Sequence, residues 1–177
     1  MENKTLTPQE QAYWDFMTAA ERCQWAWLAG IIDGEGSISI DIGHHKDMCK
    51  RGDYQLRVRV KMTDELTIRT AKAITHVGSV HPIRYPSELG WKTAWDWVTT
   101  DRKAASVLRH CMPFFVTKKE HARIALEFYK LTLDRRECNR GLREPNIEKR
   151  QALHEAICIL NKKGPGKTPP SNSNVGD

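Results

Sequence analysis

The stretch Leu28-Ala29-Gly30-Ile31-Ile32-Asp33-Gly34-Glu35-Gly36 decides the fold predicted for this chain of 177 residues. It ends a helical pattern that begins at the capping box Thr18-Ala19-Ala20-Glu21. Gly30 and Gly34 are four residues apart, so they share one face of the helix with Ala26. Glycine inside a helix costs about 1 kcal/mol relative to alanine, and the close approach of a second helix would offset that cost.

A carboxylate, Glu35, ends this helix and is followed directly by a strand pattern. A negative charge is unfavourable at the C-terminal end of a helix because of the helix dipole. A divalent cation would reverse the effect, and nearby main-chain carbonyls would add oxygen ligands. The alternative is a solvated carboxylate without function.

Two segments of alternating polarity follow the helix, residues 37–42 and 55–62, and they predict an antiparallel ribbon. The charges of the second segment all lie on one face. Residues 50–61 contain five basic residues and one acidic residue, which is +4 of the formal net charge of +6. The ribbon is therefore expected to be apolar on one face and basic on the other, which suits nucleic acid. A plain solvated sheet face is the alternative.

The remaining pattern predicts one sheet with helices on one side, an α+β layer arrangement. Another capping box, Thr117-Lys118-Lys119-Glu120, opens one of the helices. The other expected helices are 8–17, 64–76, 101–111 and 145–161, and the other strands are 79–85 and 92–99. Residues 1–17 are expected to be an N-terminal helical extension, 18–163 the main domain and 164–177 a disordered tail.

Composition excludes several classes of protein. The longest apolar run, residues 25–32, is far shorter than the roughly 20 residues that cross a bilayer. The N-terminus has no apolar signal region, which disfavours secretion. The five cysteines contain no C-x-x-C pair and are expected to be reduced thiols. No phosphate-binding glycine loop, nucleophile elbow or cofactor fingerprint supports an ordinary metabolic enzyme.

The nine residues 28–36 resemble the LAGLIDADG motif of homing endonucleases, with Ile for Leu and Gly-Glu for Ala-Asp. Pro113-Phe114-Phe115, followed by Lys118, Ala122 and Leu126, looks like the closing segment of that family. The resemblance covers about residues 20–132. It implies the αββαββα homing-endonuclease fold, an antiparallel sheet forming a saddle with helices on one face, here with extra N- and C-terminal helices.

The resemblance also implies site residues. A single motif implies a homodimer whose motif helices pack at the two-fold axis, through Ala26, Gly30, Asp33 and Gly34. Glu35 would be catalytic and bind Mg²⁺ or another divalent cation, with the Gly34 carbonyl as a further ligand; Ca²⁺ would be a non-cleaving substitute. Lys118 would act near the scissile phosphate and Asp64 would organise water. The alternatives are an ordinary surface lysine for Lys118 and a simple helix N-cap for Asp64.

The function that the resemblance implies is a double-strand break at a long, pseudo-palindromic DNA site by Mg²⁺-dependent hydrolysis. The alternative is the same fold binding nucleic acid without cleavage, as an RNA maturase or a DNA-binding regulator. The expected partners are double-stranded DNA and a second copy of the chain, with no membrane, and the expected location is inside the cell, in the cytoplasm, nucleoid or an organelle. The loop residues expected to contact phosphates are Lys46, Lys50 and Arg51. The other residues expected to face DNA are Ser37, Ser39, Asp41, Gln55, Arg57, Arg59, Lys61, Ser79, His81, Arg84, Lys92 and Asp96.

Overall fold

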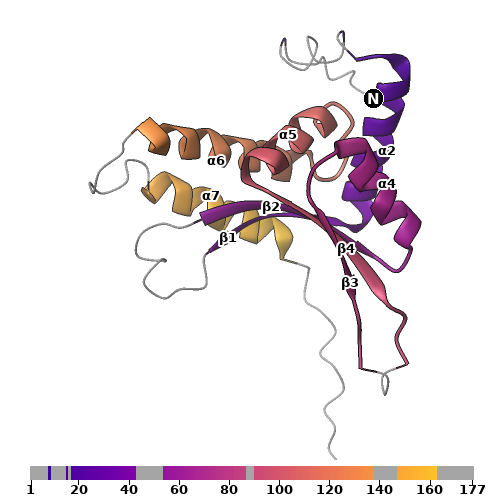
Figure 1. The fold of residues 1–177 in the computed structure, drawn as a ribbon. Helices are drawn as coiled ribbons and strands as arrows, with labels where there is room; N and C mark the ends of the chain where they lie inside the picture. Colours follow the sequence, from indigo (N-terminus) through magenta and orange to yellow (C-terminus); the bar gives the residue numbers. More distant parts are fainter. Residues whose placement is uncertain are drawn as a thin grey trace, which may run out of the picture.

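A four-stranded antiparallel sheet in the order β1-β2-β4-β3 organises the chain (Figure 1). The computed structural model describes residues 8, 15, 17–42, 54–86, 90–137 and 147–162, without the side chains of 133–137. The strands are β1 (Gly36–Ile42), β2 (Tyr54–Met62), β3 (Ser79–Ile83) and β4 (Ala94–Thr100). The two predicted strands that follow the motif helix are confirmed, each with one more residue at its start.

Helices cover one face of this sheet, which confirms the α+β arrangement. The described helices are α2 (Ala19–Glu35), α4 (Glu65–Thr75), α5 (Asp101–Cys111), α6 (Lys119–Glu137) and α7 (Ile147–Asn161). Figure 1 shows α2, α4, α5 and α6 on one side of the sheet, with the β3–β4 hairpin extending away from them. None of the described helices is long and apolar enough to span a membrane.

The core lies between the helices and the apolar face of the sheet. Ile38, Val58 and Trp97 come from three neighbouring strands and are completely buried. They belong to one cluster with helix residues such as Leu28 and Leu108. Because side chains alternate along a strand, burying these positions turns the neighbouring polar residues to the opposite face. The predicted division into an apolar and a basic face is confirmed.

Local signals account for most helix ends. At the start of α2, the Glu21 N–H donates to Thr18 Oγ1 at 3.2 Å and the Thr18 N–H donates to Glu21 Oε2 at 2.8 Å, which is the predicted capping box. The helix continues through Gly34 to Glu35. Its end is tight, since a Cβ at Gly36 would lie 2.7 Å from the Ile32 Cα.

The second strand pair is shorter at its hairpin end than predicted, because β3 stops at Ile83 and β4 begins at Ala94. Pro82 lies within β3, which is an edge strand and tolerates a residue without an N–H. The predicted helix 8–17 and tail 164–177 fall almost entirely outside the described residues.

Helix α7 packs against α6 and along the free edge of β1. His154 Nδ1 lies 2.6 Å from the Ile40 carbonyl oxygen, and Asn161 Nδ2 donates to the Ile38 carbonyl at 2.9 Å. A carbonyl only accepts, so Nδ1 of His154 carries the hydrogen. These two bonds satisfy outward-facing carbonyls of an edge strand, which are otherwise open to pairing with another chain.

Candidate functional site

The end of α2 is bound to the start of α6 through Asp33. Its Oδ2 accepts the Val116 N–H at 2.8 Å, and its Oδ1 accepts the Lys118 N–H at 2.8 Å and the Thr117 hydroxyl at 3.0 Å. Partial burial raises the pKa of Asp33, but these hydrogen bonds outweigh it and the pKa lies below its ordinary value. The ionised carboxylate therefore fixes residues 116–118 beside the motif helix.

The predicted capping box at Thr117 is wrong. The helix α6 begins at Lys119, and the Thr117 hydroxyl donates to Asp33. The Glu120 carboxylate binds Arg123 at 2.7 Å. The N–H groups before α6 thus donate to the Asp33 carboxylate of a distant helix. An ionised carboxylate is a stronger acceptor than the hydroxyl of a capping box.

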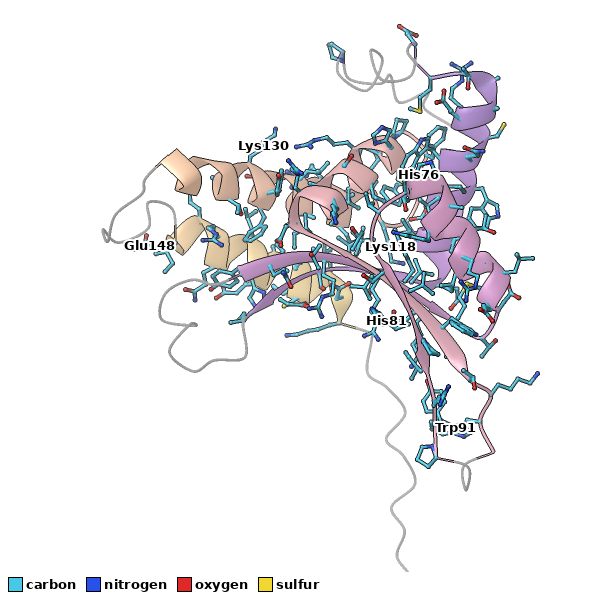
Figure 2. All side chains as sticks on the ribbon, viewed as in Figure 1. His76, His81, Trp91, Lys118, Lys130 and Glu148 are labelled. Carbon is cyan, nitrogen blue, oxygen red and sulfur yellow. The ribbon has the colours of Figure 1, made fainter. Side chains whose placement is uncertain are left out.

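Lys118 is held by the same contact. Its Nζ donates to the Asp33 carbonyl oxygen at 2.6 Å, and its side chain is half-buried. The carbonyls at the C-terminal end of a helix carry partial negative charge and favour a cation. The Lys118 ammonium, labelled in Figure 2, is therefore directed to the end of α2, at a residue two positions before Glu35.

A hollow of about 730 Å³ brings Glu35 and Lys118 together, and Gly34 lines it as well. Glu35 is exposed. Asp64 does not line this hollow. It is an exposed residue that caps α4, where its Oδ2 accepts the Thr67 N–H at 2.8 Å. Two of the three predicted catalytic residues thus share one site, and the N-cap alternative describes the contact that Asp64 makes.

Several residues of this hollow were not predicted from the sequence. They are Thr117, His121, Leu160, Asn161 and Lys162, and Ser37 also lines the hollow. His121 is three residues after Lys118, hence on the same side of α6. Its Nδ1 is buried and forms no hydrogen bond with the described residues. The three-residue spacing from Lys118 could have predicted that His121 lines the same hollow. No local sequence pattern connects the end of α7 to residues 28–36.

Among the residues that the structure describes, nothing packs on the glycine face of α2. A Cβ added at Gly30 or Gly34 would have no neighbour within 4 Å beyond adjacent residues and the helix's own backbone. Trp27, on the same face, is 38% exposed. Ala26 is half-buried, and Asp33 is turned to α6 as described above. Of the residues predicted for a dimer interface, the two glycines form an open surface.

Ion pairs organise the polar face of the sheet. Arg57 binds Asp41 of β1 at 2.8 Å, and Arg59 binds Asp96 of β4 at 2.7 Å. The side-chain hydrogen bond with Asp96 raises the pKa of Arg59. Asp96 is almost completely buried under this contact, so it presents Arg59 to the surface rather than its own carboxylate.

The other residues expected to face DNA are distributed as follows. Register places Ser37 opposite Arg59, Ser39 opposite Arg57 and Asp41 opposite Gln55, all on the polar face. His81 lies opposite Asp96, and Ser79 opposite Val98 (Figure 2). Arg84 and Lys92 are exposed just outside β3 and β4. The predicted phosphate contacts Lys46, Lys50 and Arg51 lie outside the described residues.

A second hollow, of about 580 Å³, adjoins the same carboxylate. Glu35 lines it together with Lys61, Met62, Thr63, Tyr85, Trp91, Lys92 and Ala94. Glu35 therefore stands between two hollows, one leading to Lys118 and the other to the β3–β4 hairpin. Among the described residues, no cluster of three or more His, Cys, Asp or Glu side chains forms a metal site within one chain.

Comparison with solved structures identifies the fold. The homing endonuclease I-CvuI, crystallised with its target and Ca²⁺, superposes with a TM-score of 0.66 at 18% identity, over 86% of this chain and 90% of that one. The archaeal intron-encoded homing endonuclease I-Vdi141I, complexed with DNA, gives a TM-score of 0.53 at 13% identity, over 78% of this chain and 99% of that one.

A third structure, the LAGLIDADG homing endonuclease I-SmaMI bound to cleaved DNA, gives a TM-score of 0.60 at 11% identity. The superposition covers 90% of this chain and 55% of I-SmaMI. No protein-family model and no curated protein sequence matches the chain. The similarity in structure therefore establishes that this chain has the homing-endonuclease fold.

Proposed function

We propose that this protein is a site-specific DNA endonuclease that acts as a homodimer with Mg²⁺ or another divalent cation. The observation that carries the proposal is the shared hollow of Glu35 and Lys118, at the border of a sheet face that carries Arg57, Arg59 and Lys61. A carboxylate and an ammonium group beside a basic surface suit the hydrolysis of a polyanion. The three solved structures with this fold are homing endonucleases with DNA.

The homodimer is supported by the open face of α2. Gly30 and Gly34 leave room for a second helix at close range, and Trp27 adds exposed apolar area beside them. The fold unit covers 55% of the I-SmaMI chain but 90% of the I-CvuI chain. A unit that occupies about half of one chain and nearly all of another is suited to pairing with a second copy of itself.

The residues present fit a divalent cation that is shared between copies. Each chain offers one exposed carboxylate, Glu35, at a helix end whose last carbonyls lack intrahelical donors. The Gly34 carbonyl is the further ligand that we propose. Carboxylate and carbonyl oxygens are the donors that Mg²⁺ and Ca²⁺ prefer. Since one chain has no cluster of three such side chains among its described residues, Glu35 of a second copy and DNA phosphate oxygens would complete the site.

Hydrolysis requires an attacking water, in-line geometry and neutralisation of charge on the phosphate. Mg²⁺ supplies Lewis-acid activation and neutralisation when bound. Lys118 contributes a fixed ammonium for the charge that develops as the new P–O bond forms and the ester bond breaks. The Asp33 carbonyl holds this ammonium in place before DNA arrives, so little reorganisation is needed at the moment of reaction.

We propose that DNA lies on the polar face of the sheet. Arginine suits guanine and glutamine suits adenine in the major groove, and Arg57, Arg59 and Gln55 all lie on this face. Ion pairs with Asp41 and Asp96 restrict the motion of the two arginine side chains, which lowers the entropy that binding must remove. The place of action would be the DNA of the cell that makes the protein, and residues 18–163 would form the endonuclease domain.

The experiment is cleavage selection from a randomised, near-palindromic DNA pool, with Mg²⁺ and separately with EDTA, followed by sequencing of the cut ends. We expect cut ends at one pseudo-palindromic site in the reaction with Mg²⁺ and no cut ends in the reaction with EDTA. Glu35→Gln should abolish cutting, because the amide is a poorer cation ligand, and should keep binding. Glu65→Gln is the matched control on a half-buried carboxylate outside both hollows. Selective binding without any cut ends would contradict the endonuclease and favour a nucleic-acid-binding protein of this fold.

A further inference from the structure

An aromatic corner lies where the β3–β4 hairpin meets β2, and it consists of Lys61, Tyr85 and Trp91. The rings of Tyr85 and Trp91 contact each other edge to face, with centroids 5.2 Å apart and planes at 73°. Lys61 Nζ lies 5.2 Å from the centroid of the Tyr85 ring. Figure 2 shows Trp91 toward the tip of the hairpin, away from the helices.

Trp91 is unlike the other two tryptophans of this strand region. Trp97 is completely buried and Trp95 is half-buried, whereas Trp91 is 64% exposed. The core therefore explains Trp97 but leaves most of the Trp91 ring in solvent. Large exposed aromatic side chains are typical of binding surfaces.

The corner belongs to the hollow that Glu35 also lines. The cations on its walls are Lys61 and Lys92, and its apolar surface comes from Trp91, Tyr85 and Met62. A ligand that fits must offer negative charge beside an apolar group, and it must approach from the polar face of the sheet. A DNA duplex offers phosphates to the two lysines, and in its major groove the C5-methyl of thymine is the apolar group that base pairs present.

We infer that the aromatic corner is a subsite for one thymine near the scissile phosphate, whose methyl group contacts the Trp91 ring. The inference rests on the proposed function, because it assumes that DNA lies on the sheet with the cut at Glu35. The subsite would give the protein a preference for thymine through an apolar contact. The rest of the proposed DNA surface would recognise bases through charged and amide side chains.

The test replaces thymine by deoxyuridine, which removes the methyl group alone, at single positions of the selected target close to the cut. Affinity is measured by fluorescence anisotropy in Ca²⁺ for the full chain and for Trp91→Ala. At one position of the half-site, we expect a single deoxyuridine to weaken binding by the wild-type chain about fourfold, the loss expected from one unburied methyl group, and the same change in both half-sites to weaken it about fifteenfold. Trp91→Ala should bind both targets equally.

The control is His81→Ala, which alters the same sheet face outside this hollow. It should weaken binding to both targets and keep the thymine preference. Because Trp91 is mostly exposed, Trp91→Ala should fold, which circular dichroism and thermal melting check. A structural role of Trp91 in the hairpin would lower the affinity for both targets alike and preserve their ratio.

Two results would overturn the subsite: no thymine preference near the cut in the wild-type chain, or the same preference in Trp91→Ala. Both are compatible with a wild-type chain that still cuts DNA, so they leave the proposed function standing. A wild-type chain that neither binds nor cuts any duplex would contradict the proposed function, and the subsite with it.

Discussion

Asp64 caps the helix α4, at a position where the sequence also predicts a catalytic role. Hydrogen bonds with the side chain and backbone of Thr67 lower the pKa of Asp64 below its ordinary value. Its contribution to stability is therefore present at neutral pH and is lost as the pH falls through the lowered pKa. Asparagine caps helices as well as aspartate, without titrating.

We predict that Asp64→Asn melts at the wild-type temperature at pH 7 and loses less stability than wild type on acidification to pH 3. Asp64→Ala should melt lower at pH 7, because the cap is removed. Thermal unfolding followed by circular dichroism measures both. The same variants test the catalytic role predicted from the sequence. Lost cleavage by Asp64→Asn at unchanged stability would support that role, and full cleavage would contradict it.

Under the proposed function, Asp33 would act on the reaction through Lys118. We predict that Asp33→Ala lowers kcat about a hundredfold, because residues 116–118 lose the carboxylate that accepts three of their hydrogen bonds and the backbone that carries the Lys118 side chain is no longer fixed. The Kd for DNA should change little, since Asp33 lies off the polar sheet face. Thr117→Val, which removes one of these bonds, is the milder control.

Single-turnover kinetics and binding titrations separate the two effects in these variants. Wild-type kcat in Asp33→Ala would contradict the positioning role. Sedimentation of the same variant tests the predicted place of Asp33 in a dimer interface, because a positioning residue leaves the dimer intact.

At the scale of elements, α7 protects the edge of the sheet. We predict that His154→Ala and Asn161→Ala each lower the free energy of unfolding by about 1 kcal/mol, because each leaves an edge carbonyl of β1 without its donor. Gln151→Ala, an exposed change on the same helix, should have almost no effect. Urea denaturation measures the differences, and unchanged stability in both variants would contradict an edge-protecting role.

The elements themselves were largely predictable from the sequence, and their long-range contacts were not. Alternation fixed β1 and β2, and the capping box at Thr18 fixed the start of α2, because these signals are local. The start of α6 was misjudged, since its acceptor is Asp33, 85 residues away from Lys118. For the same reason only a family resemblance predicted that Glu35 and Lys118 share one site, and His121 and Lys162 were not predicted. Parity predicted which face Arg59 occupies but not that Asp96 would bind it.

At the scale of the whole molecule, the glycine face of α2 predicts assembly. Gly30→Leu should leave the monomer folded, because a Cβ at this position meets no atom of another described element within 4 Å, and helix propensity improves by about 1 kcal/mol. It should nevertheless prevent dimerisation and cleavage, since two helices could no longer approach closely. Gly36→Ala is the contrasting variant, expected to destabilise the monomer itself because its Cβ would meet the Ile32 backbone.

Light scattering coupled to gel filtration, together with thermal melting, distinguishes these outcomes. A dimeric, cleaving Gly30→Leu variant would contradict the proposed interface. A monomeric variant with a wild-type or higher melting temperature would support it.

The bonds between Asp33 and residues 116–118 also set an order of events during synthesis. A ribosome translates the motif helix and the whole sheet before it reaches Lys118, so a growing chain has its polar strand face well before the ammonium group is in place. Closing a loop of this length is slow compared with forming a single helix or hairpin. If the protein is the endonuclease proposed above, a nascent chain on this pathway would contact DNA without cutting it, and cutting would begin once this long-range contact had formed.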